Sequence, residues 1–521
     1  MSDDTRSAHP PRPAAPVPSA AGGRLLRTGR RLREVSAADL PARAGELLAE
    51  GFRLGLVAAH EDSDAFRVVY LFTAGAPDRR VELALRTDRD TPTVPSLASL
   101  SFPAGRFERE MRDLYGIVPL NHPLPRRLVR HAHWPRGWYP MRSDAGPPPP
   151  FGSTDERYPF LRVEGPGVYE IPVGPVHAGL IEPGHFRLTV VGETILKLKA
   201  RLWFTHKGIE KLAEGRTPGD ALPLAERVSG DTTVGHTLAF CLAVEDAYDW
   251  TVPAQAGLLR AVLLELERLY NHVADLGALC NDVGYGILNA HALRVREQLL
   301  RLNADVTGHR LLRGAVLPGG AQVRALPTPG QLAAIAADVA EIVELALRNS
   351  VVRDRFTGTA VLGAEQVRDI GALGYVARAS GVDIDARRDH PFHDATAQVP
   401  AVTLDEGDVL ARFLVRAGEI QTSVALIEAL LDGARSGAAH RDPPPRLPGG
   451  QVSGVGLVEG WRGTLAHRIE IGPDGTLARL KIVDPSFLTW PALPVALADT
   501  IVPDFPLTNK SFNLSYAGND L

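Results

Sequence analysis

Two histidines, His177 and His185, stand close together in a stretch rich in glycine and proline, GPVHAGLIEPGHF (residues 174–186). Glycine and proline favour a tight turn, which would bring the two imidazoles near each other. Because imidazole exchanges protons near neutral pH, this pair could serve proton transfer or hold a polar ligand. A turn histidine that only hydrogen-bonds to backbone is the competing interpretation, and the sequence leaves both open.

Thiol chemistry is limited to two cysteines, Cys241 and Cys280, in 521 residues. This number excludes a disulfide framework, an iron-sulfur cluster held by four cysteines, and a zinc module built on three or four thiolates. Cys280 follows Leu276 and Leu279 at helical spacing, which favours a small buried hydrophobe, and Cys241 is interpreted in the same way.

Charge balance and motif content exclude several other functions. Lys and Arg number 57 against 61 Asp and Glu, a net charge of −4, which is too balanced for a nucleic-acid or polybasic membrane-surface protein. No G-x-x-x-x-G-K-[ST], H-E-x-x-H or G-x-S-x-G string occurs, so these phosphate-binding, zinc-protease and serine-hydrolase signatures are missing. Because no apolar run of about 18 residues occurs either, we expect no segment that spans a bilayer.

The elements that would position these residues combine helices and strands in an α+β fold. An apolar stripe predicts a short helix over 40–48, and alternation predicts three antiparallel strands at 54–58, 68–72 and 81–85. Alternation also predicts a hairpin over 185–202, directly after the two histidines. Apolar residues at three- and four-residue spacing then predict long bundle helices over 253–276, 293–312, 331–348 and 409–431, and strands return after residue 454.

Composition suggests where the chain divides into domains. The first residues are rich in Pro, Ala and Ser, and PPPP at 147–150 suits neither a helix nor a sheet ladder. The divisions that we expect are a disordered leader (1–28), a small α+β domain (29–145), a Pro-rich linker (146–164) and a domain rich in bundle helices with peripheral strands (165–521).

Several strings resemble subunits of one class of respiratory enzyme. FEREMRDLYGI (107–117) with HPLPRRLVRH (122–131) resembles the signature of the 30 kDa subunit of complex I, although its composition also fits a helix end capped at Gly116. The second half resembles the 49 kDa subunit of complex I and, more closely, the large subunit of group 4 membrane-bound nickel-iron hydrogenases. The matching strings are GPVHAG, EPGHFR, HKGIEK, ERVSGDTTVGH and VEGWRG. Fusion of both halves resembles the large subunits of formate hydrogenlyase and hydrogenase-4.

The resemblance implies a nickel-iron centre held by four thiolates, but all four cysteines are absent. The ligand positions fall on Ser229, Thr232, Ser515 and Gly518. Hydroxyls ionise far above neutral pH and glycine has no side chain, so these residues cannot form a soft tetrathiolate site. We therefore expect no nickel in this chain and no hydrogen turnover by it.

The complex I relatives imply a second use of the same cavity, which is quinone binding. There a histidine and a tyrosine hold the two quinone carbonyl oxygens, and an aspartate tunes the histidine. These roles fall on His185, Arg227 and Asp282, and His177 belongs to the same turn. Arginine in place of tyrosine donates hydrogen bonds but cannot give up a proton at neutral pH, which weakens the case for quinone reduction.

Two further charged residues belong to the implied site. Glu182 stands where hydrogenases keep a proton-carrying carboxylate, and a solvated turn glutamate is the alternative. Arg462 is expected to point into the former metal cavity or to form a salt bridge, for example with Glu459. The sequence ends three residues after Gly518, so the Leu521 carboxylate is expected to approach Arg462 or Arg227.

Two functions follow from the resemblance. The chain is either an assembly and coupling module without its metal centre, or a catalytic subunit that reduces quinone or another small acceptor. Implied partners are an iron-sulfur small subunit, which would dock on residues 174–185 and 229–236, and membrane antiporter-like subunits at the cytoplasmic side of the cell membrane. No cofactor is expected in this chain itself apart from quinone as a candidate ligand, any NAD contact is expected in another subunit, and no nucleic acid is expected.

Overall fold

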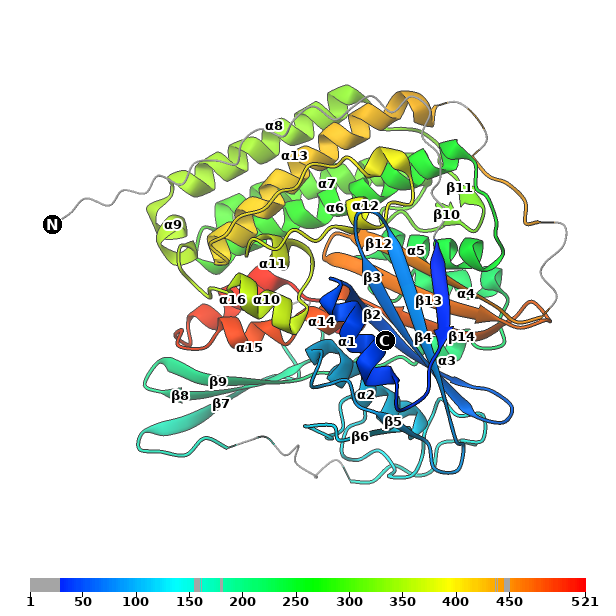
Figure 1. Ribbon diagram of the computed structural model, residues 1–521. Helices are drawn as coiled ribbons and strands as arrows, with labels where there is room; N and C mark the ends of the chain where they lie inside the picture. The colour runs from blue at the N-terminus through cyan, green and yellow to red at the C-terminus, as the bar shows by residue number, and fades with distance from the viewer. Residues whose placement is uncertain are drawn as a thin grey trace.

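The computed structural model describes residues 29–153, 160, 162–178, 181–435, 437, 439–444 and 450–521. The expected leader (1–28) and residues 154–159 of the expected linker lie outside this part of the chain. Figure 1 shows a long helical bundle, several small sheets and a C-terminal group of short helices, so the predicted α+β fold class is confirmed. Within the described ranges, no helix is long and apolar enough to cross a membrane.

The N-terminal part is built on a four-stranded sheet. Its elements are β1 (Arg30–Glu34), α1 (Leu40–Ala49), β2 (Arg53–Glu61), β3 (Phe66–Ala74), β4 (Arg79–Thr87), β5 (Thr93–Pro95), α2 (Phe102–Tyr115) and β6 (Val118–Leu120). The strand order is β1-β4-β3-β2, with β1 parallel to β4 and the other pairs antiparallel. The three strands predicted from alternation are confirmed as β2, β3 and β4. Strand β1 has no such signal, because its sequence RRLRE is charged and mostly exposed at the sheet edge.

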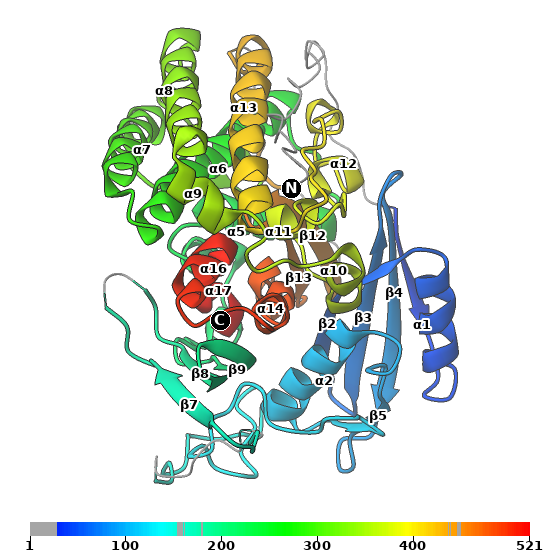
Figure 2. The same cartoon turned by 90° about the vertical axis from the view of Figure 1, so that its left-hand side faces the viewer.

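Long helices form a bundle in the second part, and the apolar periodicity predicts four of those named below but not the helix over 233–247. They are α5 (Thr233–Ala247), α6 (Ala254–Asp282), α7 (Gly286–Thr307), α8 (Pro329–Arg348) and α13 (Val409–Ala434). Helix α6 packs against both α7 and α13, and most of its residues are buried (Figure 2). A capping box between Thr328 and Gln331 fixes the start of α8.

Two three-stranded antiparallel sheets lie on either side of the C-terminal helices. The hairpin sheet contains β7 (Val168–Val173), β8 (His185–Val191) and β9 (Thr194–Arg201), as predicted, and the C-terminal sheet contains β12 (Val452–Gly460), β13 (Gly463–Ile471) and β14 (Leu477–Val483). Strand β12 packs directly on α5. A Cβ at Gly454 would lie 1.9 Å from the Ala243 oxygen and one at Gly456 equally close to Ala239, so only glycine allows this contact.

Short elements connect these layers. They are α3 (Ile209–Ala213), α4 (Pro218–Ala225), β10 (Val316–Leu317), β11 (Gly320–Ala321), α9 (Ser350–Phe356), α10 (Ala364–Ile370), α11 (Gly374–Arg378), α12 (Ala386–Asp389), η1 (Asp394–Thr396), α14 (Pro485–Thr489), α15 (Ala492–Ala496), α16 (Asp504–Phe512) and α17 (Tyr516–Asp520). Helices α16 and α17 bring the C-terminal segment between the bundle and the hairpin sheet (Figure 2).

A buried ion-pair network joins the N-terminal sheet to the C-terminal sheet. Arg468 on β13 lies 2.9 Å from both Glu82 on β4 and Glu470, and Glu470 lies 2.8 Å from Arg67 on β3. Burial opposes the charge of Glu470, but His60, Arg67 and Arg468 hold its pKa well below the usual range. One apolar core cluster also contains residues of both parts. The domain boundaries therefore stay predictions, because the core is continuous across them.

Replacing Glu470 by Gln should lower the free energy of unfolding by about 3 kcal/mol, because Arg67 and Arg468 lose the anion between them. Urea unfolding followed by tryptophan fluorescence measures this change. Glu344→Gln is the matched control, since it removes a carboxylate from an exposed ion pair with Arg348. If both substitutions lower the free energy of unfolding equally, the buried network stabilises the protein no more than an exposed ion pair does.

Candidate functional site

Four segments meet where the sequence places the former ligand positions. They are residues 229–232 before α5, the turn 461–462 between β12 and β13, the C-terminal segment 513–521, and residues 174–178 and 181–185 of the turn before β8. Ser229, Thr232 and Ser515 are all at most 4% exposed. The region is thus an interior site formed by parts of the chain that are far apart in sequence.

An ion pair between Arg462 and Asp231 lies at the centre of this region. The Nη1 and Nη2 groups of Arg462 donate to the two Asp231 oxygens at 2.8 and 2.7 Å, and Nε donates to the Asn513 oxygen at 2.6 Å. The guanidinium also stacks on Trp461, 3.8 Å from the ring centroid. Burial opposes both charges, but the pairing raises the pKa of Arg462 and lowers the pKa of Asp231 to about 2.

Hydroxyl groups at the former ligand positions bond to each other and to this ion pair. Ser229 Oγ lies 2.8 Å from Ser515 Oγ and donates to Asp231 at 2.7 Å. Thr232 donates to Asp231 at 3.0 Å and accepts from Trp461 Nε1 at 3.1 Å. A soft metal needs thiolate lone pairs, whereas these oxygens are hydroxyls that already have partners. The residues present therefore do not fit a nickel-iron centre.

At the fourth former ligand position, Gly518, the Asp484 carboxylate occupies the space that a side chain would need. A Cβ at this residue would lie 2.5 Å from the Asp484 carboxylate, while the Gly518 N–H donates to Ser515 Oγ at 2.8 Å.

Asp484 also accepts a hydrogen bond from His236 Nε2 at 3.1 Å, and the other ring nitrogen of His236 lies 3.0 Å from His467 Nε2. All three side chains of this chain of bonds are at most 1% exposed. His236 is thus a buried histidine with both ring nitrogens bonded.

The turn histidines hold the turn together. His177 Nε2 bonds to the Gly184 oxygen at 2.7 Å, and His185 Nδ1 bonds to the Gly174 oxygen at 3.1 Å. A carbonyl oxygen only accepts, so each of these ring nitrogens carries a proton. Glu182 is exposed and accepts from the Ala517 N–H at 2.8 Å. The structure therefore gives all three residues local contacts that fix the turn and tie it to the C-terminal segment.

Comparisons with known proteins agree with this architecture. Residues 33–149 match the family of the respiratory-chain NADH dehydrogenase 30 kDa subunit, residues 207–280 match nickel-dependent hydrogenase, and residues 282–449 match the respiratory-chain NADH dehydrogenase 49 kDa subunit. Formate hydrogenlyase subunit 5 of Escherichia coli (strain K12) is 33% identical over 84% of this chain and 79% of that protein. The chain belongs to the family of complex I-related nickel-iron hydrogenase large subunits.

Other members of the family show the same likeness. Hydrogenase-4 component G of the same organism is 33% identical over 83% of this chain and 77% of that protein, and the C/D subunit of NADH-quinone oxidoreductase from Phocaeicola vulgatus is 30% identical over 76% and 80%. Among solved structures, a chain of the membrane-bound sulfane sulfur reductase, an archaeal respiratory membrane complex, has a TM-score of 0.62 and 25% identity over 68% of this chain and 99% of that one. The recognised family is thereby confirmed.

Two residues that the family suggested for quinone binding lie away from the ion pair. Arg227 follows α4, its side chain is 53% exposed, and it donates to the Pro223 oxygen at 2.8 Å. Asp282 is the exposed last residue of α6, where Lys510 is its charged neighbour. Within the described part of the chain, neither side chain bonds to Arg462 or Asp231, so a pocket that includes Arg227 and Asp282 stays a prediction.

The contacts of the C-terminal residue, Leu521, also differ from the expectation. The Leu521 oxygen accepts from the N–H groups of Lys207 and Gly208, both at 2.9 Å, instead of approaching Arg462 or Arg227. These N–H groups precede the first turn of α3, where backbone donors favour an acceptor. The C-terminal segment reaches Arg462 through the backbone oxygen of Asn513, which accepts from Nε.

Asp231 is the functional residue that the sequence reasoning missed. It lies inside the string ERVSGDTTVGH, between two former ligand positions, but its type does not match any family role considered there. The available signal was an acidic residue beside Ser229 and Thr232 together with a cation expected in the same cavity. A buried arginine needs an anion, and Asp231 is the acid that the chain places within its reach.

The stability that Asp231 contributes should depend on pH. Its pKa is lowered to about 2, so the contribution is present above the unfolded value of about 3.9 and is lost as the pH falls toward 2. Because the side chain is 38% exposed, solvent screening reduces the expected loss to about 1 kcal/mol. Urea unfolding of the chain and of Asp231→Asn at about pH 6 and about pH 3 measures it. If the difference in unfolding free energy between the unaltered chain and Asp231→Asn is the same at both pH values, this assignment is contradicted.

Proposed function

We propose that this chain is a metal-free large subunit that acts as an assembly and coupling module in a membrane-associated oxidoreductase complex related to hydrogenase-4 and complex I. The observation that carries the proposal is the Arg462–Asp231 ion pair among the former ligand positions. A fixed cation repels a metal ion, and the hydroxyls around it are engaged by Asp231. The fold is kept while the chemistry of the metal is replaced by a salt bridge.

Contacts around the ion pair support a coupling role. Arg462 bonds to Asn513 of the C-terminal segment, and the same segment donates from Ala517 to Glu182 in the turn before β8. Displacement of this turn would therefore be transmitted to the interior through a continuous set of hydrogen bonds. We infer that the turn senses a partner and that the ion pair keeps its support rigid.

Solvent exposure indicates which of the two expected segments an iron-sulfur subunit would contact. His236 is 0% exposed and Ser229 only 3%, so within the segment 229–236 only Gly230 and Asp231 offer a partner appreciable surface. The turn before β8 exposes Val176 at 86% and Ile181 at 43%, and we propose it as the docking segment.

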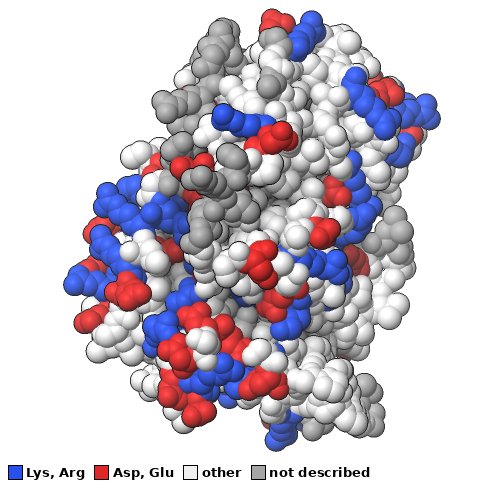
Figure 3. Space-filling model, turned by 90° about the vertical axis from the view of Figure 1, so that its right-hand side faces the viewer, with Lys and Arg blue, Asp and Glu red and all other residues white. Residues whose placement is uncertain are grey.

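Antiporter-like subunits at the cytoplasmic side of the cell membrane complete the proposed complex. On the face in Figure 3, acidic and basic side chains are interspersed, unlike the single-sign field of a nucleic-acid surface.

Purification of the complex with its partners tests the proposed function. We expect far less than one nickel atom per chain by elemental analysis, and we expect His185→Ala to leave electron transfer to quinone unchanged. His440→Ala, an exposed histidine in a loop, is the matched control. Stoichiometric nickel would overturn the metal-free assignment. A loss of about 100-fold in quinone reduction with an intact complex would favour the alternative, a catalytic subunit that reduces quinone or another small acceptor.

Charge reversal at Arg187 tests the docking face. This residue lies on β8, 3.4 Å from Glu170, and Arg187→Glu would place two carboxylates side by side beneath the docking turn. We expect the amount of iron-sulfur subunit that co-purifies to fall about tenfold. Arg301→Glu, at a 76% exposed position on α7, should leave the stoichiometry unchanged. If Arg187→Glu also leaves it unchanged, the partner docks elsewhere.

A further inference from the structure

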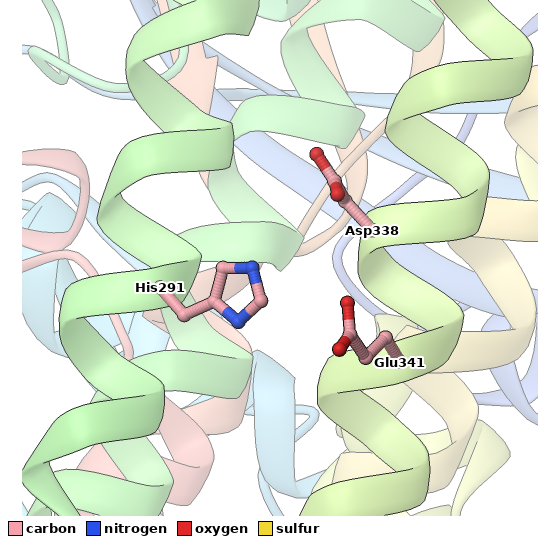
Figure 4. A group of neighbouring side chains, drawn as sticks. All are labelled: His291, Asp338 and Glu341. Carbon is pink, nitrogen blue, oxygen red and sulfur yellow. The ribbon is translucent and has the colours of Figure 1, made fainter.

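Three side chains that bind metals in other proteins meet on the outer side of the helical bundle. His291 comes from α7, and Asp338 and Glu341 come from α8 (Figure 4). One ligand atom from each residue lies within 4.8 Å of the others. This group is separate from the Arg462 region, and it plays no part in the proposed function.

The bundle core fixes the spacing of these side chains. Asp338 and Glu341 are three residues apart, so they share one face of α8. Buried residues next to them, including Val339 on α8 and Ala292 on α7, belong to one apolar cluster. Both helices are thus held in place by packing, and a site built on two rigid helices keeps its geometry better than one built on loops.

The group already accommodates a cation. The Arg294 guanidinium bonds to His291 Nε2 at 2.8 Å and lies 3.1 Å from Asp338. Because the guanidinium has only donors, the Nε2 lone pair of His291 points into the group and is available to a metal. The Glu341 carboxylate has no hydrogen bond or ion pair to any other residue that the structure describes. Arg294 is 49% exposed, so moving its side chain into solvent breaks only a screened and weak ion pair.

We propose that His291, Asp338 and Glu341 bind a divalent transition-metal cation of the Zn²⁺ class and thereby staple α7 to α8. One imidazole nitrogen and two carboxylate oxygens are donors that Zn²⁺ accepts, and water can complete a tetrahedral shell. The imidazole selects against Mg²⁺ and Ca²⁺, which bind oxygen. Arg294 is the competing cation, and metal binding displaces it.

Titration of the chelator-treated full chain with Zn²⁺ tests the site. We expect one Zn²⁺ bound per chain, no comparable binding of Mg²⁺, and a visible absorption band of tetrahedral Co²⁺ when Co²⁺ replaces Zn²⁺. His291→Ala should weaken Zn²⁺ binding by about 100-fold or more. Arg294→Gln should strengthen it by up to about fivefold, because the competing ion pair is removed.

The matched control is Glu344→Gln, which removes a neighbouring carboxylate of α8 that pairs with Arg348. It should leave Zn²⁺ binding unchanged, and Zn²⁺ should raise the melting temperature of this control but not that of His291→Ala. Absence of Zn²⁺ binding in both the unaltered chain and Arg294→Gln would overturn the proposal. Equal binding by His291→Ala and the unaltered chain would also overturn it, since the metal would then sit elsewhere.

Discussion

The charge of Arg462 is the constraint on which the interior of this protein depends. A guanidinium buried beneath the bundle is tolerated only when an anion and acceptors surround it, and removing such a partner costs several kcal/mol. Thiolates bound to a metal would supply negative charge in this region. Here Asp231 supplies it instead, and Ser229 and Thr232 donate to the same carboxylate. One acid, two hydroxyls and the arginine therefore satisfy one another at the positions where the family resemblance implies soft ligands.

The same pairing recurs at three other buried arginines of the helical part, whereas buried Arg412 is satisfied by Ser511 and two backbone oxygens. Arg260 pairs with Glu245, Arg378 with Glu419, and Arg416 with Asp275, and each of these arginines is at most 1% exposed. Such pairs contribute little net stability, since desolvation offsets their attraction, but they permit few alternative arrangements of the helices. The network through Arg468 extends this pairing to the N-terminal sheet. Buried ion pairs thus hold the helical part together and join it to the N-terminal sheet.

The sequence predicts the elements well where periodicity is strong and the site poorly where contacts are tertiary. Alternation locates β2, β3, β4 and the hairpin, and the apolar stripe locates α6 and α13 to within a few residues, because burial of one face dictates those patterns. Strand β1 is charged and pairs only at an edge, so no local pattern marks it. Arg227 and Asp282 carry family roles in the sequence, yet side-chain direction depends on the last turn of a helix, which the sequence alone does not fix. The sequence does place an acid at Asp231 beside Ser229, but its pairing with Arg462 is a tertiary contact that no local pattern marks.

Three of the former ligand positions lie next to one another in the fold. Ser229 and Ser515 are 286 residues apart in sequence, and their hydroxyl oxygens lie 2.8 Å apart. Backbone groups maintain this proximity, since the Ser515 N–H donates to Ser486 and the Trp490 indole donates to the Ser515 oxygen. Hydrogen bonds and packing within the chain are therefore sufficient to bring these positions together. Under the proposed function, such a site lets a subunit without the thiolates stay folded and contribute mechanically.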